Sequence, residues 1–291
     1  MGSSIKDIVD SGSVYIIAEI GQNHQGDIEH AKKLIRKAAE AGVNAVKSQK
    51  RHTRTLLTPD EYDRPYDSPN AFADTYGKHR DALELSVEQH LELKQVAENL
   101  GLDYFVSPWD PVSASQMNEV GMPLMKIASA GITDKETIDA ACEGGAPLIF
   151  STGMSTEEEI EQAANWVREA GIEIKCILHC TSTYPAEFNQ LNLNYIPVLK
   201  QNYPDFIIGF SGHHRGISID IAAVTLGAKI IERHFTLDRT QKGSDHAASL
   251  EFPGLSKLVR DIRALELAMG DGIKRVYEQE LPMIEKLRRV K

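Results

Sequence analysis

Cysteine is scarce in this sequence, and the count is odd, which excludes a disulfide framework. The chain of 291 residues has three cysteines, at Cys142, Cys176 and Cys180, whereas disulfide-held domains carry dense, even sets. Such sparse cysteine use is typical of a reducing compartment, so we expect a cytoplasmic protein. Cys176 and Cys180 lie within KCILHC at a spacing conceivable for a metal. No second cysteine pair follows, and buried structural thiols are the favoured interpretation.

Long apolar runs and a basic excess are missing too. No stretch reaches the roughly 20 apolar residues that a membrane-spanning helix needs, and the segment MGSSIKDIVDSG lacks the apolar core of a signal peptide. Acidic residues outnumber basic ones, 42 against 32, for a net charge of −10. This charge repels nucleic acid and anionic membranes, so we expect neither as a partner. A phosphate substrate is still allowed, because a few nearby Lys or Arg residues can outweigh the average negative charge of the surface.

Eight short apolar runs, each separated by a segment with helical spacing, recur along the chain. The runs are 14–20, 44–49, 103–108, 124–128, 147–152, 175–180, 206–211 and 229–235. Their central residues are apolar on both faces, as in buried parallel strands. The alternation predicts an α/β fold of the (β/α)8 TIM-barrel type. A doubly wound open sheet is the main alternative, but no glycine-rich phosphate turn follows the first run.

We expect one TIM-barrel catalytic domain over residues 1–291, with 1–12 as an N-terminal extension and 280–291 as a C-terminal tail or linker remnant. The sequence has no internal repeat. One long connection, 50–85, is rich in charge, Pro and Tyr, and connections of that length are usually functional or mobile, so we interpret it as a lid. The helical pattern is least regular over 189–202.

Polar side chains stand at the carboxyl ends of all eight expected strands, where β/α barrels carry their active sites. They are Glu19, Lys47, Gln49, Ser107, Lys126, Ser151, Thr152, Thr181, Ser182, Ser211, His213, Glu232 and His234. Alternation along a strand places Lys47 with Gln49, and Glu232 with His234, on shared faces. Because a buried Lys or Glu is costly unless it is paired or bound to a ligand, this convergence indicates a site.

The residue types suggest its chemistry. Lys47 and Lys126 suit an anion, and serine hydroxyls donate hydrogen bonds to phosphate oxygens. The imidazoles of His213 and His234 are good ligands for Mn, Zn or Fe, and Glu19 could serve as a general base. The set predicts a reaction that forms or breaks a carbon–carbon bond on a phosphorylated small molecule.

At this point the sequence resembles the sialic acid synthase family, whose members condense phosphoenolpyruvate with a mannose-type sugar. Eight motifs in order carry the resemblance over nearly the whole chain. They are AEIGQNHQGD (18–27), AVKSQ (45–49), SPWD (107–110), KIASA (126–130), STGMS (151–155), HCTSTYP (179–185), GFSGHH (209–214) and ERHFTLDRTQKGSDHAASLE (232–251).

The resemblance implies a role for each matching residue. Phosphoenolpyruvate would be bound by Lys47, Ser107, Lys126, Ser151, Ser182 and Ser211. His213 and His234 match the ligands of a divalent metal, with Mn first and Mg or Co as alternatives. Glu19 matches the acid/base carboxylate, and Gln49, Tyr184 and Asp245 match contacts to metal-bound water or the sugar. The expected product is a nine-carbon 2-keto-3-deoxy sugar acid, sialic acid or its 9-phosphate, and the expected assembly is a homodimer.

Three departures from the family pattern bear on the acceptor. Ser48 stands where the family usually has an aromatic residue, but alternation along the strand directs its side chain away from the barrel axis. Ser182 stands where many bacterial members have Asn, which is closer to the animal type that uses a 6-phosphorylated sugar; Arg51, His52 and Arg54 would then supply basic groups. The chain ends at MIEKLRRVK, without the antifreeze-like domain that usually follows in the family.

The acceptor sugar therefore stays open between N-acetylmannosamine, its 6-phosphate, mannose and mannose 6-phosphate. A metal-dependent aldolase on the same barrel is the alternative enzyme. A non-catalytic carbohydrate-binding barrel is the remaining hypothesis, and it is disfavoured because it would be expected to lose the buried charges.

Overall fold

The computed structural model describes residues 5–290, and its eight parallel strands close into a barrel. The strands pair in chain order, and the last pairs with the first. They are β1 (Tyr15–Gly21), β2 (Ala45–Lys50), β3 (Asp103–Pro108), β4 (Met125–Ile127), β5 (Leu148–Ser151), β6 (Lys175–Cys180), β7 (Ile207–Gly212) and β8 (Ile230–His234). The predicted (β/α)8 TIM barrel is confirmed. The ends of the expected extension and tail, 1–4 and 291, lie outside the described residues.

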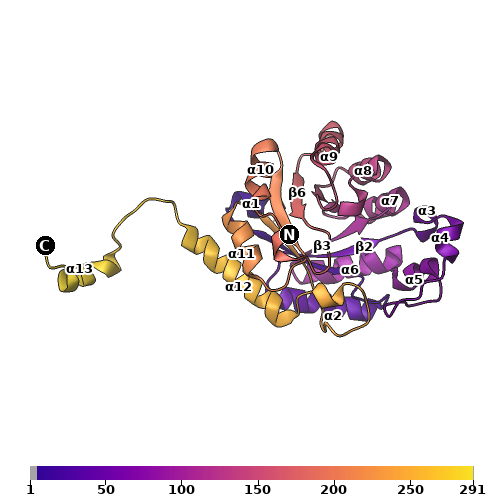
Figure 1. Cartoon of the computed structure of the whole chain (residues 1–291), viewed down its shortest axis with the longest axis horizontal. Helices are drawn as coiled ribbons and strands as arrows, with labels where there is room; N and C mark the ends of the chain where they lie inside the picture. Colours follow the sequence, from indigo (N-terminus) through magenta and orange to yellow (C-terminus); the bar gives the residue numbers. More distant parts are fainter. Residues whose placement is uncertain (1–4, 291) are drawn as a thin grey trace.

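Helices surround the barrel, and the last helix of the chain lies away from it (Figure 1). They are α1 (Ile5–Asp10), α2 (Ile28–Ala41), α3 (Thr53–Leu56), α4 (Pro59–Asp63), α5 (Tyr76–Leu83), α6 (Val87–Asn99), α7 (Pro111–Val120), α8 (Lys135–Cys142), α9 (Glu157–Glu169), α10 (Tyr195–Asn202), α11 (Ser218–Thr225), α12 (Phe252–Met269) and α13 (Leu281–Leu287). Short 3-10 turns lie at Ser129–Gly131, Phe188–Gln190, His246–Ala248 and Glu278–Glu280. None of the described helices is long and apolar enough to span a membrane.

Helix α2 illustrates how local sequence sets these elements. The carboxylate of Asp27 accepts hydrogen bonds from the backbone N–H groups of Glu29 and His30, which caps the first turn. Gly42 ends the helix in the left-handed conformation, at φ 86°. Between them, the buried positions Ala31, Leu34, Ile35, Ala38 and Ala41 recur every three or four residues. The helix therefore presents one apolar stripe to the barrel.

Two segments differ from a simple repeat. The long connection 50–85 contains three helices, α3, α4 and α5, and an antiparallel bridge between Pro65 and Thr75. In Figure 1 these helices project from one side of the barrel. The irregular segment 189–202 becomes helical only from Tyr195. Pro197 lies in the first turn of α10, where its missing N–H costs no helical hydrogen bond.

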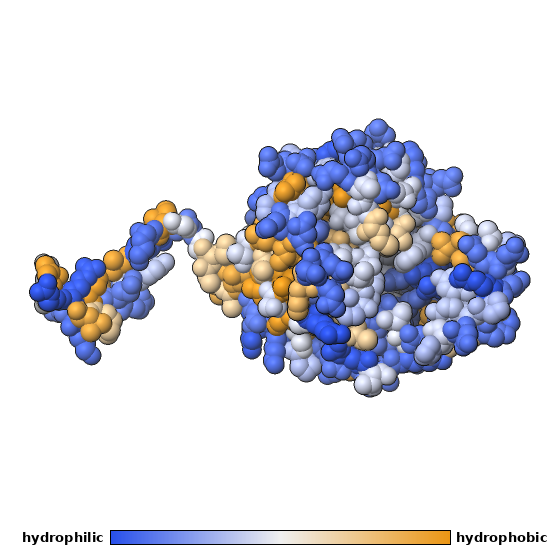
Figure 2. Space-filling view, viewed as in Figure 1, coloured by the Kyte–Doolittle hydropathy of each residue, from blue (hydrophilic) through white to orange (hydrophobic). Residues whose placement is uncertain are grey.

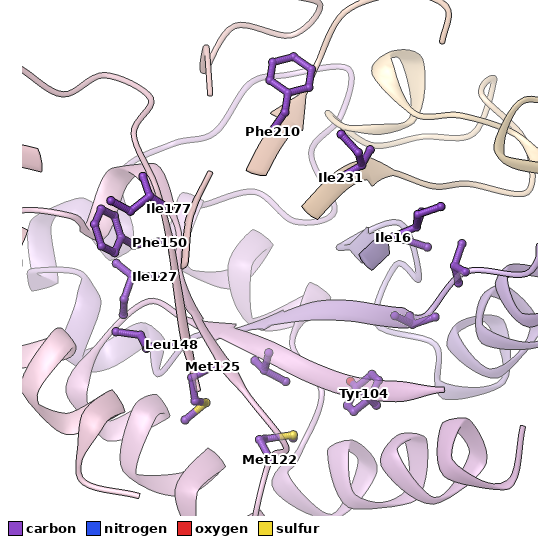
Figure 3. Packing of buried hydrophobic residues seen from close by; sticks show 14 of the residues in the cluster. Ile16, Tyr104, Met122, Met125, Ile127, Leu148, Phe150, Ile177, Phe210 and Ile231 are labelled. Atoms are coloured by element: carbon purple, nitrogen blue, oxygen red, sulfur yellow. The ribbon is translucent and has the colours of Figure 1, made fainter. Parts of the chain in front are cut away.

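Alternation along the strands builds two distinct cores. Outward side chains, including Ile16, Tyr104, Met125 and Phe150, pack between the strands and the helices (Figure 3). Inward side chains form a second cluster that fills the amino-terminal half of the barrel: Ile5, Tyr15, Ile17, Ala45, Phe105, Leu124, Ile149, Cys176, Leu178 and Ile230. Beyond this apolar floor, the next inward positions are polar.

The segment after α12 leads away from the barrel to α13 (Figure 1). The last turn of α12 and the segment after it expose apolar side chains, with Leu267 of α12 87% and Ile273 66% exposed. Figure 2 shows the same segment and the neighbouring surface of α11 and α12 as apolar patches on an otherwise mostly hydrophilic molecule. The boundary of the predicted tail stays a prediction.

Candidate active site

A cavity of about 190 Å³ opens at the carboxyl ends of the strands, above the apolar floor. Eleven of the twelve predicted site residues lie on its wall: Glu19, Lys47, Gln49, Ser107, Lys126, Ser151, Ser182, Tyr184, Ser211, His213 and His234. The twelfth, Asp245, has its carboxylate 3.9 Å from Nδ1 of His234. Side chains that are 226 residues apart in sequence, from Glu19 to Asp245, thus meet in one place because all eight strands point the same way.

The first charged pair comes from neighbouring strands. Glu19 of β1 and Lys47 of β2 are register partners, and their side chains form a buried ion pair. The ammonium of Lys47 also donates to Oγ of Ser107 at 2.8 Å. Nε2 of Gln49 donates to Oε1 of Glu19 at 2.9 Å. These contacts hold the carboxylate of Glu19 at the cavity wall, between the ammonium group of Lys47 and the amide group of Gln49.

Gly21 makes room for this arrangement. A Cβ at this position would lie 2.8 Å from Oε1 of Glu19 and 3.1 Å from Nε2 of Gln49, and the φ of Gly21 is +42°. The register of β1 against β2 also shifts between Glu19 and Gly21. Glycine at the end of β1 therefore lets the carboxylate and the amide approach each other.

The second charged pair spans the barrel from β4 to β8. The ammonium of Lys126 contacts Oε1 of Glu232, which also accepts a hydrogen bond from Ser211 at 3.0 Å. Burial alone would raise the pKa of Glu232, but the ammonium groups of Lys126 and Lys47 outweigh it and lower the pKa to about 2. The carboxylate of Glu232 is therefore ionised at neutral pH, whereas burial lowers the pKa of its partner Lys126.

Several buried polar atoms of the cavity residues have no hydrogen-bond partner, among them Oγ of Ser151 and Oε2 of Glu232. A buried hydroxyl or carboxylate oxygen without a partner is unfavourable. Such groups are expected where a ligand or water completes the hydrogen bonding.

The two histidines lie side by side with ring centroids 5.4 Å apart. Nδ1 of His213 lies 2.9 Å from the carbonyl oxygen of Thr181, which holds that ring in place. Burial acts to lower the pKa of His213, but its contacts with Cys180 and Thr181 outweigh burial and raise it. Burial lowers the pKa of His234, in spite of the nearby carboxylate of Asp245.

Tyr184 stands over this pair, with its ring centroid 4.2 Å from that of His213 and 5.8 Å from that of His234. Its side chain is half exposed at the mouth of the cavity. No group of three or more His, Cys, Asp or Glu side chains within residues 5–290 is placed to hold a metal ion. A cation bound by the two imidazoles would thus take its other ligands from water or substrate.

Comparison with known proteins identifies the family of this chain. The profile of the NeuB family matches residues 34–274. The chain belongs to the NeuB family. The expected resemblance to the sialic acid synthases is therefore confirmed.

This NeuB-family chain is similar over most of its length to named synthases. It is 40% identical over 273 residues to N-acetylneuraminate-9-phosphate synthase from Homo sapiens, covering 94% of this chain and 76% of that protein. It is 39% identical over 277 residues to N,N'-diacetyllegionaminic acid synthase from Campylobacter jejuni, covering 94% and 83%. The crystal structure of N-acetylneuraminic acid (sialic acid) synthetase from Leptospira borgpetersenii superposes with a TM-score of 0.79 at 33% identity, covering 96% and 93%.

The NeuB-family barrel also contains cavity residues that the sequence interpretation did not include. Cys180, Ser129 and Trp109 line the wall. Glu232, which the sequence placed at this end of the barrel without a role, is the partner of Lys126. All three cysteines are free and buried, as predicted. Cys180 lies on the cavity wall as well, 3.8 Å from Nδ1 of His213. The alternation Cys176, Leu178, Cys180 along β6 was the available signal, since all three share the inward face.

Ser129 could not have been found in the same way. It lies in the 3-10 turn after β4, where strand alternation no longer applies. Its Oγ accepts from the backbone N–H of Gly153 at 3.1 Å. Ser48, by contrast, points away from the axis as predicted, with its Oγ 2.7 Å from the hydroxyl of Tyr104.

The basic residues after β2 divide into two groups. Arg51 is buried, stacks 4.1 Å from the ring of Trp109 and donates to Oε1 of Gln49 at 2.6 Å. His52 contacts Thr55, and Arg54 stacks 3.5 Å from the ring of Tyr62. Of the three arginine and histidine candidates, Arg51 is the one that contacts a residue of the cavity wall.

Proposed function

We propose that this chain is a transferase that condenses phosphoenolpyruvate with an N-acylmannosamine-type sugar, N-acetylmannosamine or its 6-phosphate. The products are a nine-carbon 2-keto-3-deoxy sugar acid, sialic acid or its 9-phosphate, and phosphate. The observation that carries the proposal is the convergence of two buried Lys–Glu pairs, a ring of serines and two imidazoles in one cavity. Membership of the NeuB family and the names of its relatives support the same reaction class.

Phosphoenolpyruvate would lie between the two lysines. Lys47 and Lys126 supply positive charge, and hydroxyls from neighbouring strand ends supply hydrogen-bond donors. These hydroxyls are Ser107, Ser151, Ser182 and Ser211, all on the cavity wall. The unpartnered Oγ of Ser151 is ready to donate to such an anion.

Glu19 is the candidate acid/base group. In the proposed reaction, C3 of phosphoenolpyruvate forms a bond to the aldehyde carbon of the sugar, and C2 becomes electron-poor. As this bond forms, the C=O π bond of the aldehyde breaks and its oxygen takes up a proton. Water adds at C2 and gives up a proton, and we assign the carboxylate of Glu19, on the cavity wall, as the base. The tetrahedral intermediate then breaks its C2–O bond to phosphate, and the keto group forms. Lys47 and Lys126 stabilise the negative charge of the phosphate throughout.

We assign Gln49, Tyr184 and Asp245 to the acceptor sugar, because Gln49 and Tyr184 line the cavity and Asp245 lies next to His234 on its wall. Gln49 links Glu19 to Arg51 through hydrogen bonds at both ends of its amide. Tyr184 covers the two imidazoles from the solvent side. These side chains would orient the sugar so that its aldehyde carbon faces C3 of phosphoenolpyruvate, which contributes through proximity and orientation.

The charges of the cavity fit a divalent cation. Three carboxylates, Glu19, Glu232 and Asp245, stand against two ammonium groups, Lys47 and Lys126, and phosphoenolpyruvate adds further negative charge. A cation would offset this imbalance.

The imidazoles of His213 and His234 are suited to hold that cation. A hydrogen bond from Nδ1–H of His213 to the carbonyl of Thr181 leaves its Nε2 lone pair available. Nδ1 of His234 is buried without a hydrogen-bond partner. Mn²⁺ is the proposed ion, with Mg²⁺ or Co²⁺ as alternatives, and when bound it would polarise the aldehyde oxygen as a Lewis acid. Removal of divalent ions with EDTA should abolish turnover, and titration of each ion back into the protein should rank them.

The proposal extends to a cytoplasmic homodimer. The exposed apolar side chains of Leu267 and Met269 in the last turn of α12, and of Ile273 after it, support self-association through this region. Multi-angle light scattering of the purified chain tests the assembly, because a monomeric mass at micromolar concentration contradicts it.

The deciding experiment is phosphate release from phosphoenolpyruvate with a panel of acceptors, read together with the mass of the keto-acid product. The panel contains N-acetylmannosamine, mannose and the 6-phosphate of each. We expect release with at least one N-acylated acceptor. Release with mannose or its 6-phosphate alone supports the related condensation instead. Release with no acceptor across several divalent ions, combined with cleavage of a keto acid, supports a metal-dependent aldolase.

A further inference from the structure

A second cavity of about 110 Å³ lies next to the active site. It is formed between the connection 50–85 and the loop after β8, and its lining includes Gln22, Asn70, Arg80, Ser244 and Asp245. A single water needs roughly 10–15 Å³ of such space, so a group of several heavy atoms fits. Of the twelve predicted site residues, only Asp245 lines this cavity.

Asp245 connects the two cavities. Its carboxylate lines the second cavity and lies 3.9 Å from Nδ1 of His234 in the first. A Cβ on Gly21 would lie 3.4 Å from Oδ2 of Asp245 and 3.1 Å from Nε2 of Gln49, so these groups are close neighbours. A sugar held beside His234 and Gln49 therefore has the second cavity within reach of its far end.

Arg80 brings a cation to this cavity without a carboxylate partner. Its Nε and Nη2 donate to the hydroxyl of Tyr76 at 3.1 and 2.7 Å, and its Nη1 donates to Oε1 of Gln22 at 2.9 Å. Other lysines and arginines near the active site, such as Lys47 and Arg51, each face a glutamate. A half-buried guanidinium held by neutral groups is well placed to bind an anion.

Further groups on or next to the wall of this cavity suit an anion. Nε2 of Gln22 is buried without a hydrogen-bond partner. The ammonium of Lys242 lies 4.9 Å from the ring centroid of Phe72, which lines the cavity. Burial and the charges of Arg80, Lys242 and Arg51 lower the pKa of His79 to about 4.

We propose that this second cavity binds the phosphate group of a phosphorylated acceptor sugar, with Arg80 as the main ligand and Gln22 and Lys242 as further donors. The aldehyde end of the same sugar lies in the first cavity, beside His234 and Asp245. This inference rests on the proposed function and makes it narrower, because it assigns the phosphorylated sugar as the preferred acceptor. A phosphate offers several oxygens and suits three converging donors.

The test compares two acceptors, N-acetylmannosamine and its 6-phosphate, in wild type and Arg80→Gln at saturating phosphoenolpyruvate. The readout is the ratio of kcat/KM for the phosphorylated acceptor to kcat/KM for the unphosphorylated one. We expect wild type to favour the phosphorylated acceptor and Arg80→Gln to lower the ratio about 10- to 100-fold, as for the loss of a charge-assisted hydrogen bond. Arg80→Lys should restore part of the ratio, since it keeps the charge.

Arg54→Gln is the matched control, because Arg54 belongs to the same connection but stacks on Tyr62. It should leave the ratio at the wild-type value. Gln22→Leu tests the neutral donor and should lower the ratio several-fold without a change of charge. The KM for phosphoenolpyruvate, measured for each variant, reports whether the first cavity is intact.

The outcomes separate this inference from the function on which it rests. If wild type favours the unphosphorylated sugar, or if Arg80→Gln leaves the ratio unchanged, the phosphate site is overturned while the condensation stands. If neither acceptor yields phosphate and keto acid with the wild-type protein, the proposed function is contradicted, and the phosphate site that rests on it is contradicted as well.

Discussion

The imidazole rings of His213 and His234 lie side by side at the barrel mouth, with centroids 5.4 Å apart, although one residue follows β7 and the other ends β8. Parallel neighbouring strands end at the same edge of the barrel, so their last side chains meet. This relationship is what would allow both rings to face the proposed ion and the proposed substrate.

Replacement of His234 with Ala tests this pair. Because loss of metal-supplied stabilisation costs several kcal/mol, we expect phosphate release to fall at least about 100-fold. Calorimetry should show weaker Mn²⁺ binding to the variant, and circular dichroism should show an unchanged fold. Full activity with unchanged Mn²⁺ affinity would remove His234 from the metal site. Replacement of His52, an exposed histidine, with Ala is the control and should have no effect on either measurement.

Glu19→Gln tests the proposed base. The amide keeps the size of the side chain but cannot take a proton from water, so kcat should fall about 10²- to 10⁴-fold. The KM for each substrate should change far less than kcat. Glu40→Gln on the exposed face of α2 serves as the control for the loss of one carboxylate. An unchanged kcat in Glu19→Gln would assign proton transfer to another group.

Variants of the Lys126–Glu232 pair should show different effects on stability and on activity. Lys126→Met leaves the buried carboxylate of Glu232 without its cation, and this should cost about 3–5 kcal/mol of unfolding free energy in urea. Lys126→Met with Glu232→Gln removes both charges and keeps an acceptor for Ser211. The double variant should regain most of the lost stability and stay inactive. Recovery of activity in the double variant would show that Lys126 has only a structural role.

Gly153 is predicted to position two serines of the cavity. A Cβ on Gly153 would lie 2.1 Å from Oγ of Ser182 and 2.8 Å from Oγ of Ser129. Gly153→Ala should therefore displace both hydroxyls and lower kcat/KM for phosphoenolpyruvate about 10- to 100-fold. Gly254→Ala in α12 meets its nearest neighbour, a Leu250 methyl, at 3.4 Å, and should leave kinetics unchanged. Equal kinetics for the two variants would contradict the predicted displacement.

His90 links stability to pH. It is fully buried, its Nδ1 lies 2.9 Å from the hydroxyl of Tyr104, and burial lowers its pKa to about 3 from the ordinary 6.5. The unfolded chain takes up a proton below pH 6.5 while the folded chain does not, so stability is lost as pH falls from 6.5 toward 3.

At pH 5 this single group should cost about 2 kcal/mol relative to pH 7. Urea unfolding of wild type and His90→Gln at both pH values measures the difference, and the loss on acidification should be smaller in the variant by that amount. Identical losses in the two proteins would show that His90 does not govern this dependence.

Much of the site follows from strand alternation. Glu232 and His234 share a parity, as do Lys47 and Gln49, and the structure places all four on the cavity wall. Sequence alone could predict this, because a barrel strand has one inward face and its active end is the carboxyl end. It could also predict that Ser48 faces the helices, where its hydroxyl meets Tyr104.

The partners of these groups could not be predicted. Lys126 and Glu232 are 106 residues apart and meet across the interior of the closed barrel. Which carboxylate reaches which ammonium depends on strand register and side-chain length, and neither is written in local sequence. Cys180 was assigned to packing for the same reason, since its contact with His213 joins two different strand ends.

The sequence by itself determined the order of strands and helices, the inward parity of the polar residues and the family, because these depend on periodicity and on motifs that are local in the chain. The tertiary structure alone decided which charges pair and which stay free. Arg80 lies on α5, far in sequence from Gly243 and Asp245, and they share a cavity only because the connection 50–85 folds against the loop after β8. Contacts between such distant segments are set by three-dimensional packing, which local patterns do not encode.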